Sequence, residues 1–229
     1  MRNSNASAAM IAIVDYGMGN LGSIHNMFRK VGAQAVVTAD PAVVARAEKL
    51  VLPGVGAFDH GMRSLAERGL VEVLNRKALQ ERVPVLGVCL GMQLLTERSD
   101  EGGLPGLGWI EGETVRFDRT DQPRLHAMHM GWNTLDWHAP HPIFGELPPH
   151  PRFYFVHAYH VVCRHERNVL ARSTYGYPFA SAVVEGNVVG MQFHPEKSHR
   201  FGMAVFRAFA ALGAAEAVEP AAVGAGAAG

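Results

Sequence analysis

The sequence predicts an α/β protein with three layers, in which a mostly parallel central sheet carries helices on both faces and continues into an antiparallel β-rich extension. Short apolar runs alternate with segments of helical periodicity through the first hundred residues. The second half instead contains short β-like runs separated by Pro, Gly and His clusters. The chain has 229 residues, 48% of them hydrophobic, which is enough to bury a core without disulfide bonds.

The first half consists of alternating strand and helix segments. Apolar runs predict strands at 10–14, 35–37, 50–52 and 83–88. Helical spacing and turn signals predict helices at 21–31, 41–47 and 61–80. Gly32 stands where a left-handed cap ends the first helix. Such alternation is typical of a parallel sheet covered on both faces.

The second half is predicted to be antiparallel. We expect strands at 113–117 and 152–156 and a hairpin over 183–189 that turns at Gly186 and Asn187. A final helix is expected at 201–212. These boundaries predict one domain over residues 9–212, followed by a disordered tail at 213–229 that is nearly all Ala, Gly, Val and Glu.

Composition excludes several classes of protein. The 21 basic and 21 acidic residues balance, so nothing favours binding to nucleic acid or to an anionic membrane. No apolar run is long enough to cross a bilayer, and the first residues lack the apolar stretch of a signal peptide. The two cysteines, Cys89 and Cys163, are therefore expected to be reduced thiols in the cytoplasm.

Cys89 lies between a predicted strand and a segment of helical pattern. Gly87 and Gly91 flank it two residues away on either side, as a sharp strand-to-helix turn that exposes a nucleophile requires. The first turn of the following helix and a nearby imidazolium would both favour the thiolate. The alternative is a buried cysteine that acts only as a small apolar side chain. Cys163 lacks such a turn and is interpreted as structural.

His194 and Glu196 are the candidate base and its orienting carboxylate. A histidine before a proline favours extended backbone, and side chains two residues apart in an extended segment point the same way. Glu196 could therefore hold the imidazole and set which ring nitrogen faces the sulfur. The chain has 12 histidines, so a solvated surface turn is the alternative.

A glycine loop follows the predicted strand at 50–52. Gly54, Val55 and Gly56 come directly after it, and such a loop can aim backbone N–H groups at a developing oxyanion. An ordinary βα turn also favours glycine. A phosphate-binding loop is disfavoured because no Lys-Ser or Lys-Thr follows.

These three elements, in this order, resemble the class I glutamine amidotransferases, which carry a Cys-His-Glu triad. The blocks at 87–95 and 193–198 match the two signatures of that family closely. Further blocks are similar to the branch that supplies ammonia in imidazole glycerol phosphate synthases, and they lie at 15–20, 53–58, 129–133 and 154–157. The resemblance runs from about residue 10 to residue 212.

The resemblance implies a role for each triad residue. Cys89 would attack the side-chain amide of glutamine, form a γ-glutamyl thioester and release ammonia. His194 would relay protons, first from the thiol and then to the leaving amine. Glu196 would orient His194.

The resemblance also implies an oxyanion hole and a substrate contact. Gly54 and Val55, with Gly56 beside them, would frame one side of the hole, and the N–H of Leu90 would frame the other. Gln93, one turn beyond the cysteine, would help to bind glutamine.

In the same branch the glutaminase docks on a cyclase of (β/α)8-barrel fold as a heterodimer, and ammonia passes through the barrel to a ribonucleotide intermediate in histidine biosynthesis. The family has low glutaminase activity until the cyclase binds its own ligand. His129, Trp132 and Asn133 are expected at the docking surface, although a packed β-corner would explain them equally well. His157 and Tyr159 are expected near the bound glutamine. No cofactor and no metal site are expected.

Three other interpretations stay open from the sequence. The first is another triad amidotransferase, such as the glutaminase of anthranilate, guanylate or pyridoxal phosphate synthesis, and the block at 129–133 argues against it. The second is a catalytically silent regulatory subunit, which the intact triad disfavours without excluding. The third is a γ-glutamyl hydrolase or cysteine peptidase, which would need an open substrate cleft.

Overall fold

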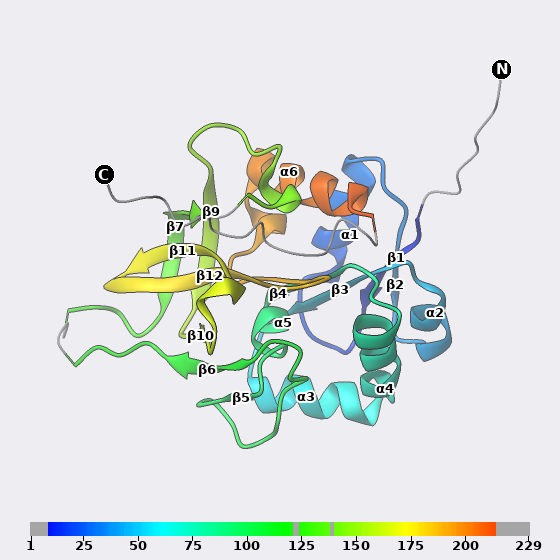
Figure 1. The fold of residues 1–229 in the computed structure, drawn as a ribbon, viewed down its shortest axis with the longest axis horizontal. Coiled ribbons are helices and arrows are strands. Elements are labelled where there is room, and N and C mark those ends of the chain that lie inside the picture. Colours follow the sequence, from blue (N-terminus) through cyan, green and yellow to red (C-terminus); the bar gives the residue numbers. More distant parts are fainter. Residues whose placement is uncertain (1–8, 121–123, 138–139, 214–229) are drawn as a thin grey trace, which may run out of the picture.

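The computed structural model describes residues 9–120, 124–137 and 140–213, and its centre is a parallel sheet (Figure 1). Five strands lie in the order β2-β1-β3-β4-β13, and every neighbouring pair is parallel. They are β1 (Ile11–Val14), β2 (Ala35–Thr38), β3 (Lys49–Gly54), β4 (Val85–Cys89) and β13 (Val188–Met191). The carboxyl ends of β3, β4 and β13 therefore meet at one edge, where α/β proteins place their ligands.

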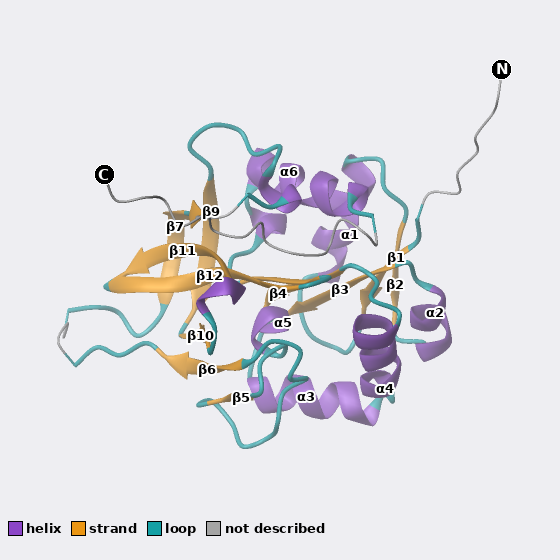
Figure 2. Ribbon diagram, viewed as in Figure 1, coloured by secondary structure: helices purple, strands orange, loops and turns teal. Residues whose placement is uncertain are grey.

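Helices cover both faces of this sheet (Figure 2). One face packs against α1 (Leu21–Lys30) and α6 (His199–Ala211) through a cluster that includes Ile11 and Ile13. The other face packs through Ala12 and Val14 against α2 (Pro41–Arg46), α3 (Phe58–Glu67), α4 (Leu70–Asn75) and α5 (Leu90–Gln93). The alternation along β1 shows that consecutive side chains enter opposite layers. The predicted three-layer α/β architecture is confirmed.

The sheet continues beyond β13 into an antiparallel extension. The next strands are β12 (Tyr177–Glu185), β10 (Tyr159–Cys163), β6 (Gly112–Arg116) and β5 (Arg98–Ser99). β11 (Val169–Tyr175) pairs with β12 and with β8 (Asp136–Trp137), while β7 (His129–Thr134) and β9 (Arg152–His157) form a separate antiparallel pair. The predicted β12–β13 hairpin is confirmed, and its Gly186 has φ of +53°.

Helical turns complete the described part of the chain. Three of them are 3-10 turns, at η2 (Pro142–Phe144), η3 (Glu166–Asn168) and η4 (Pro195–Lys197). A further π-helical turn, η1 (Arg76–Gln80), follows α4. Within the described residues, no helix combines the length and apolarity needed to cross a membrane.

One helix prediction was wrong in extent. The helix predicted over 61–80 begins earlier and is broken by Gly69, whose φ of +64° reverses the chain between α3 and α4. The segment after Cys89 is a helix of only four residues, α5, before the chain turns toward β5. Residues 214–229 lie outside the described part, so the division into a domain at 9–212 and a tail at 213–229 stays a prediction.

Gly202 allows α6 to pack directly on η4, which carries the candidate catalytic glutamate. A Cβ added there would overlap the Pro195 carbonyl oxygen, which is backbone and cannot rotate away. We expect Gly202→Ala to lower the free energy of unfolding by roughly 1–3 kcal/mol, the usual cost of overpacking. Urea denaturation measures the change.

Gly22→Ala is the matched control. Gly22 is an exposed residue of α1, and an added Cβ there would have nothing within 4 Å. The substitution should raise the free energy of unfolding by about 0.5–1 kcal/mol, because alanine favours the helix. Equal stability of the two variants would contradict the close approach at Gly202.

Candidate active site

Cys89 occupies the predicted sharp turn between β4 and α5. Its backbone has φ of +54° and ψ of −110°, a conformation that costs on the order of 1–3 kcal/mol for a residue with a side chain. Both flanking glycines are required: a Cβ on Gly91 would overlap the Leu52 carbonyl oxygen, and one on Gly87 would lie 2.8 Å from the Gly91 carbonyl oxygen. The turn therefore places the thiol at the carboxyl edge of the parallel sheet.

His194 and Glu196 form a buried pair. Nδ1 of His194 lies 2.7 Å from Oε1 of Glu196, and the two side chains are only 1% and 2% exposed. A carboxylate can only accept here, so Nδ1 carries a proton and donates it. Nε2 is buried and makes no hydrogen bond within the described part of the chain. This burial excludes the solvated surface turn that the sequence left open.

The local backbone of this pair differs from the prediction. His194 is extended, with φ of −101° and ψ of 91°, as expected before a proline. Glu196, however, lies in the 3-10 turn η4 and not in an extended segment. Ser198 Oγ holds the turn by donating to the His194 carbonyl at 2.7 Å and accepting from the Tyr154 N–H at 3.1 Å. The tight turn brings the carboxylate back toward the imidazole.

Opposing effects set the charge of His194. Burial alone lowers the pKa of this imidazole, but Cys89 and Glu196 together outweigh burial and raise the pKa to about 9. An imidazole with such a pKa is protonated at neutral pH. The pair therefore favours an imidazolium beside the sulfur, which is the partner that a thiolate nucleophile requires.

The glycine loop lies against the first turn of α5. Gly54 pairs in register with Cys89, and a Cβ on Gly54 would lie 2.8 Å from Cβ of Leu90. Among the described residues, the N–H groups of Val55 and Gly56 donate no backbone hydrogen bond. Leu90 is the first residue of α5, so its N–H has no partner within that helix. Several N–H donors are thus available close to the nucleophile.

Tyr16 supports this loop and was missed as a site residue. Its hydroxyl is fully buried and donates to the Pro53 carbonyl oxygen directly before the glycine loop. Burial, and to a lesser extent Cys89, raises the pKa of Tyr16, so the hydroxyl stays protonated. Tyr16 belongs to the block at 15–20, which the sequence marked only as a motif. Nothing in that local pattern gives the direction of its side chain.

Gln93 lies one turn beyond Cys89, as predicted. Its Nε2 donates to the Tyr159 carbonyl oxygen at 3.2 Å and to Oε1 of Gln192 at 3.1 Å. Both amide protons are used, so only the carbonyl oxygen of Gln93 is left to accept from a ligand. Gln192, a second residue that sequence reasoning missed, has its Nε2 3.8 Å from Sγ of Cys89.

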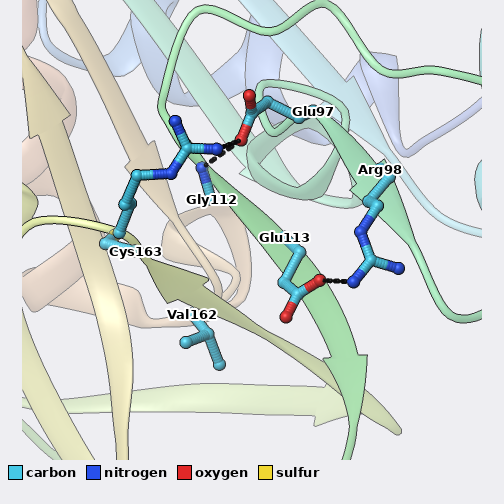
Figure 3. Close-up of a pocket in the computed structure, with 7 residues that line it drawn as sticks. Glu97, Arg98, Gly112, Glu113, Val162 and Cys163 are labelled. Carbon is cyan, nitrogen blue, oxygen red and sulfur yellow. Dashed lines mark hydrogen bonds and ion pairs between the residues drawn. The ribbon is translucent and has the colours of Figure 1, made fainter.

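The second cysteine and the ion pairs beside it lie on or next to β10, β6 and β5 and not on the strands that lead to the triad. Cys163 is on β10, and burial raises the pKa of its thiol to about 12, as expected for a structural cysteine. The hollow in Figure 3 lies beside it, and charges in that hollow pair with one another: Arg98 with Glu113, and Arg164 with Glu97 at 2.7 Å. Within the described residues, no group of three or more His, Cys, Asp and Glu side chains could hold a metal ion.

The predicted docking residues divide between surface and interior. Trp132 is 45% exposed and Asn133 is half-buried, but His129 is 5% exposed and packs between Phe155 and Tyr175. His129 therefore lies in a packed β-corner and not at the surface.

Comparison with known proteins agrees with this geometry. The family model described as "Glutamine amidotransferase class-I" matches residues 12–211. "Imidazole glycerol phosphate synthase subunit HisH 2" of Methanococcus maripaludis is 50% identical over 200 residues, covering 87% of this chain and 98% of the relative. The protein of the same name from Pseudomonas aeruginosa is 48% identical over 203 residues, covering 89% of this chain and 100% of the relative.

Solved structures agree on the fold. The structure described as PurLQS from Thermotoga maritima aligns with a TM-score of 0.69 at 18% identity, covering 88% of this chain and 97% of that one. A structure described as a glutamine amidotransferase aligns with a TM-score of 0.64 at 20% identity, covering 88% and 99% of the two chains. The family match and the two curated relatives establish that this chain belongs to the class I glutamine amidotransferases, in the branch of the HisH subunits of imidazole glycerol phosphate synthase.

Proposed function

We propose that this chain is the glutaminase subunit of an imidazole glycerol phosphate synthase and hydrolyses glutamine to glutamate and ammonia. One observation carries the proposal: the strained turn at Cys89 lies beside the buried pair of His194 and Glu196. Burying an imidazolium costs free energy, and ionisable groups with strongly shifted pKa values are concentrated at functional sites. The buried pair beside Cys89 therefore indicates a catalytic site.

The first half-reaction forms a thioester. The Cys89 thiolate attacks the side-chain amide carbon of glutamine, and the carbonyl oxygen becomes an oxyanion facing the N–H groups of Val55 and Leu90. His194 then donates the proton on Nε2 to the amide nitrogen. The carbon–nitrogen bond breaks, ammonia leaves and a γ-glutamyl thioester remains.

The second half-reaction restores the thiolate. His194, now neutral, takes a proton from a water molecule that attacks the thioester carbon. The carbon–sulfur bond breaks, the new carboxyl group releases the second proton of the water to solvent as glutamate leaves, and the thiolate and imidazolium are regenerated. Glu196 keeps Nδ1 protonated in both steps, so Nε2 is always the nitrogen that exchanges protons.

The partner is proposed to be a cyclase subunit of (β/α)8-barrel fold. The relatives are named as subunits of a synthase, and ammonia released into bulk water would be protonated and lost. An apolar strip along β7 and the residue before it is suited to docking: Met128, Met130 and Trp132 are 43%, 63% and 45% exposed. A working thiolate requires a reducing compartment, so we place the complex in the cytoplasm.

The closed site favours activation by the partner. Cys89 is only 6% exposed and His194 only 1%, so the nucleophile and its base are largely shielded from solvent, which argues against a peptidase. Val55, in contrast, is 43% exposed, and Gly54 and Gly56 flank it. A peptide flip in this loop would present or withdraw an oxyanion donor.

Glutamate release tests the proposed function. The purified chain alone should release glutamate slowly, and addition of the cyclase with a cyclase ligand should stimulate release strongly. Cys89→Ala should lose at least about 1,000-fold, because the nucleophile is absent. Cys163→Ala is the matched control and should keep the stimulated rate.

Other outcomes would point elsewhere. No release in any mixture would support a silent regulatory subunit. High release from the chain alone would indicate an independent amidase.

The pH dependence of His194 follows from its raised pKa. A proton bound more tightly in the folded chain stabilises the fold fully below the ordinary pKa of about 6.5, and this stabilisation is lost as pH rises through about 9. Glu196→Gln removes one of the groups that raise the pKa. We expect the imidazole resonance of His194, followed by NMR, to titrate near pH 9 in the wild type and at lower pH in Glu196→Gln. An unchanged midpoint would contradict the role of Glu196.

A further inference from the structure

We propose that Gln192 is the hydrogen-bond donor that holds the sulfur of Cys89, and that a chain of buried hydrogen bonds fixes its orientation. The inference deepens the proposed function and rests on it, because it concerns the same nucleophile. Gln192 is fully buried directly after β13, and its backbone N–H donates to the Ser181 carbonyl oxygen at 2.9 Å. Its Nε2 lies 3.8 Å from Sγ of Cys89, within the range of an N–H···S hydrogen bond.

The orientation of Gln192 follows from a carbonyl group. The Tyr159 carbonyl oxygen can only accept, so Gln93 must present its NH2 group to it, at 3.2 Å. The second proton on that nitrogen is donated to Gln192, which must therefore present its Oε1, at 3.1 Å. The amide of Gln192 has one remaining end, its NH2 group, and that end faces Cys89. The chain of contacts leaves no freedom to exchange the oxygen and nitrogen atoms.

Two histidines extend this series of hydrogen bonds away from the active site. His157 Nδ1 is 2.7 Å from the Tyr159 carbonyl oxygen, so this nitrogen carries the proton and Nε2 accepts. His129 must then donate from Nδ1 to His157 Nε2, at 3.1 Å. Nδ2 of Asn133 donates to His129 Nε2 at 3.3 Å and to the Thr174 carbonyl oxygen at 2.9 Å.

Both histidines are therefore neutral donors and acceptors. Burial lowers the pKa of His157 to about 3 and that of His129 to about 4, which agrees with these tautomers. Protonation of either ring would turn an acceptor into a donor and place two donors face to face. The Tyr159 carbonyl oxygen therefore accepts one hydrogen bond from His157 and another from Gln93. All the groups in this series of hydrogen bonds are neutral, and each bond has a defined donor and acceptor.

Gln192 differs from other described groups that lie near the sulfur. His194, paired with Glu196, supplies a positive charge that also transfers protons. The Tyr16 hydroxyl donates to Pro53 and not to Cys89. From β9, the Val156 carbonyl lies 4.0 Å from Sγ and can only accept from the thiol. Gln192 is thus the neutral side-chain N–H donor aimed at the sulfur among the described residues, and a donor of this kind favours the thiolate over the thiol.

The test measures the rate of Cys89 alkylation by iodoacetamide against pH, in the full-length chain without glutamine. Gln192→Met keeps the size of the side chain and removes the donor. Gln192→Glu keeps the acceptor for Gln93 and replaces the donor by a carboxylate. We expect the midpoint of the alkylation profile to rise by about one pH unit in Gln192→Met, which corresponds to a roughly tenfold lower alkylation rate at pH values well below the midpoint, and to rise further in Gln192→Glu.

The controls separate a specific effect from loss of structure. Gln34→Met changes an exposed glutamine far from the site and should leave the midpoint unchanged. Circular dichroism checks each variant, and the isosteric Gln192→Glu serves if the methionine variant does not fold. A folded Gln192 variant with a reactive Cys89 and a wild-type midpoint would overturn this inference alone. A wild-type Cys89 that resists alkylation at every pH would overturn the proposed function as well.

Discussion

The left-handed backbone of Cys89 is the constraint on which the rest of the site depends. A cysteine at φ of +54° is stable only when its surroundings force the turn. Here β4 is hydrogen-bonded between β3 and β13. Gly87 and Gly91 flank the cysteine at positions where any side chain would collide with neighbouring backbone. The same pairing brings Gly54 level with Cys89 and delivers Gln192 and His194 just after β13. Nucleophile, oxyanion loop and base therefore come together because three neighbouring parallel strands end at one edge.

Electrostatic interactions then determine which histidines near the Cys89 turn are charged. Burial by itself would keep His194 neutral, and the thiol and carboxylate on its two sides reverse that preference. The histidines farther along β7 and β9 have no such carboxylate, and burial keeps them neutral. The molecule thus places a charged imidazole at the reaction centre and neutral imidazoles in its support, using the same residue type in two environments.

Much of the fold and of the site could be predicted from local sequence patterns. Strand and helix order, the turn at Cys89 and the pairing of His194 with Glu196 all depend on residues that are close in the chain. Gly69 shows the limit, since a single glycine within a helical pattern broke the predicted helix at 61–80.

Contacts between distant segments could not be predicted. Gln93 and Gln192 are 99 residues apart, and Tyr16 and Pro53 are 37 apart. Their side chains meet only because of the strand order and register, which a single sequence does not give. The sequence left the burial of His129 open for the same reason, because the aromatic side chains that enclose it come from β9 and β11.

Covalent trapping of Cys89 tests the central claim most directly. A diazoketone analogue of glutamine alkylates the thiolate that attacks the substrate carbonyl, and peptide mass mapping then locates the adduct. The account predicts one adduct, on Cys89, that forms faster when the cyclase is present and is suppressed by excess glutamine. An adduct on Cys163, or no adduct under any condition, would contradict it.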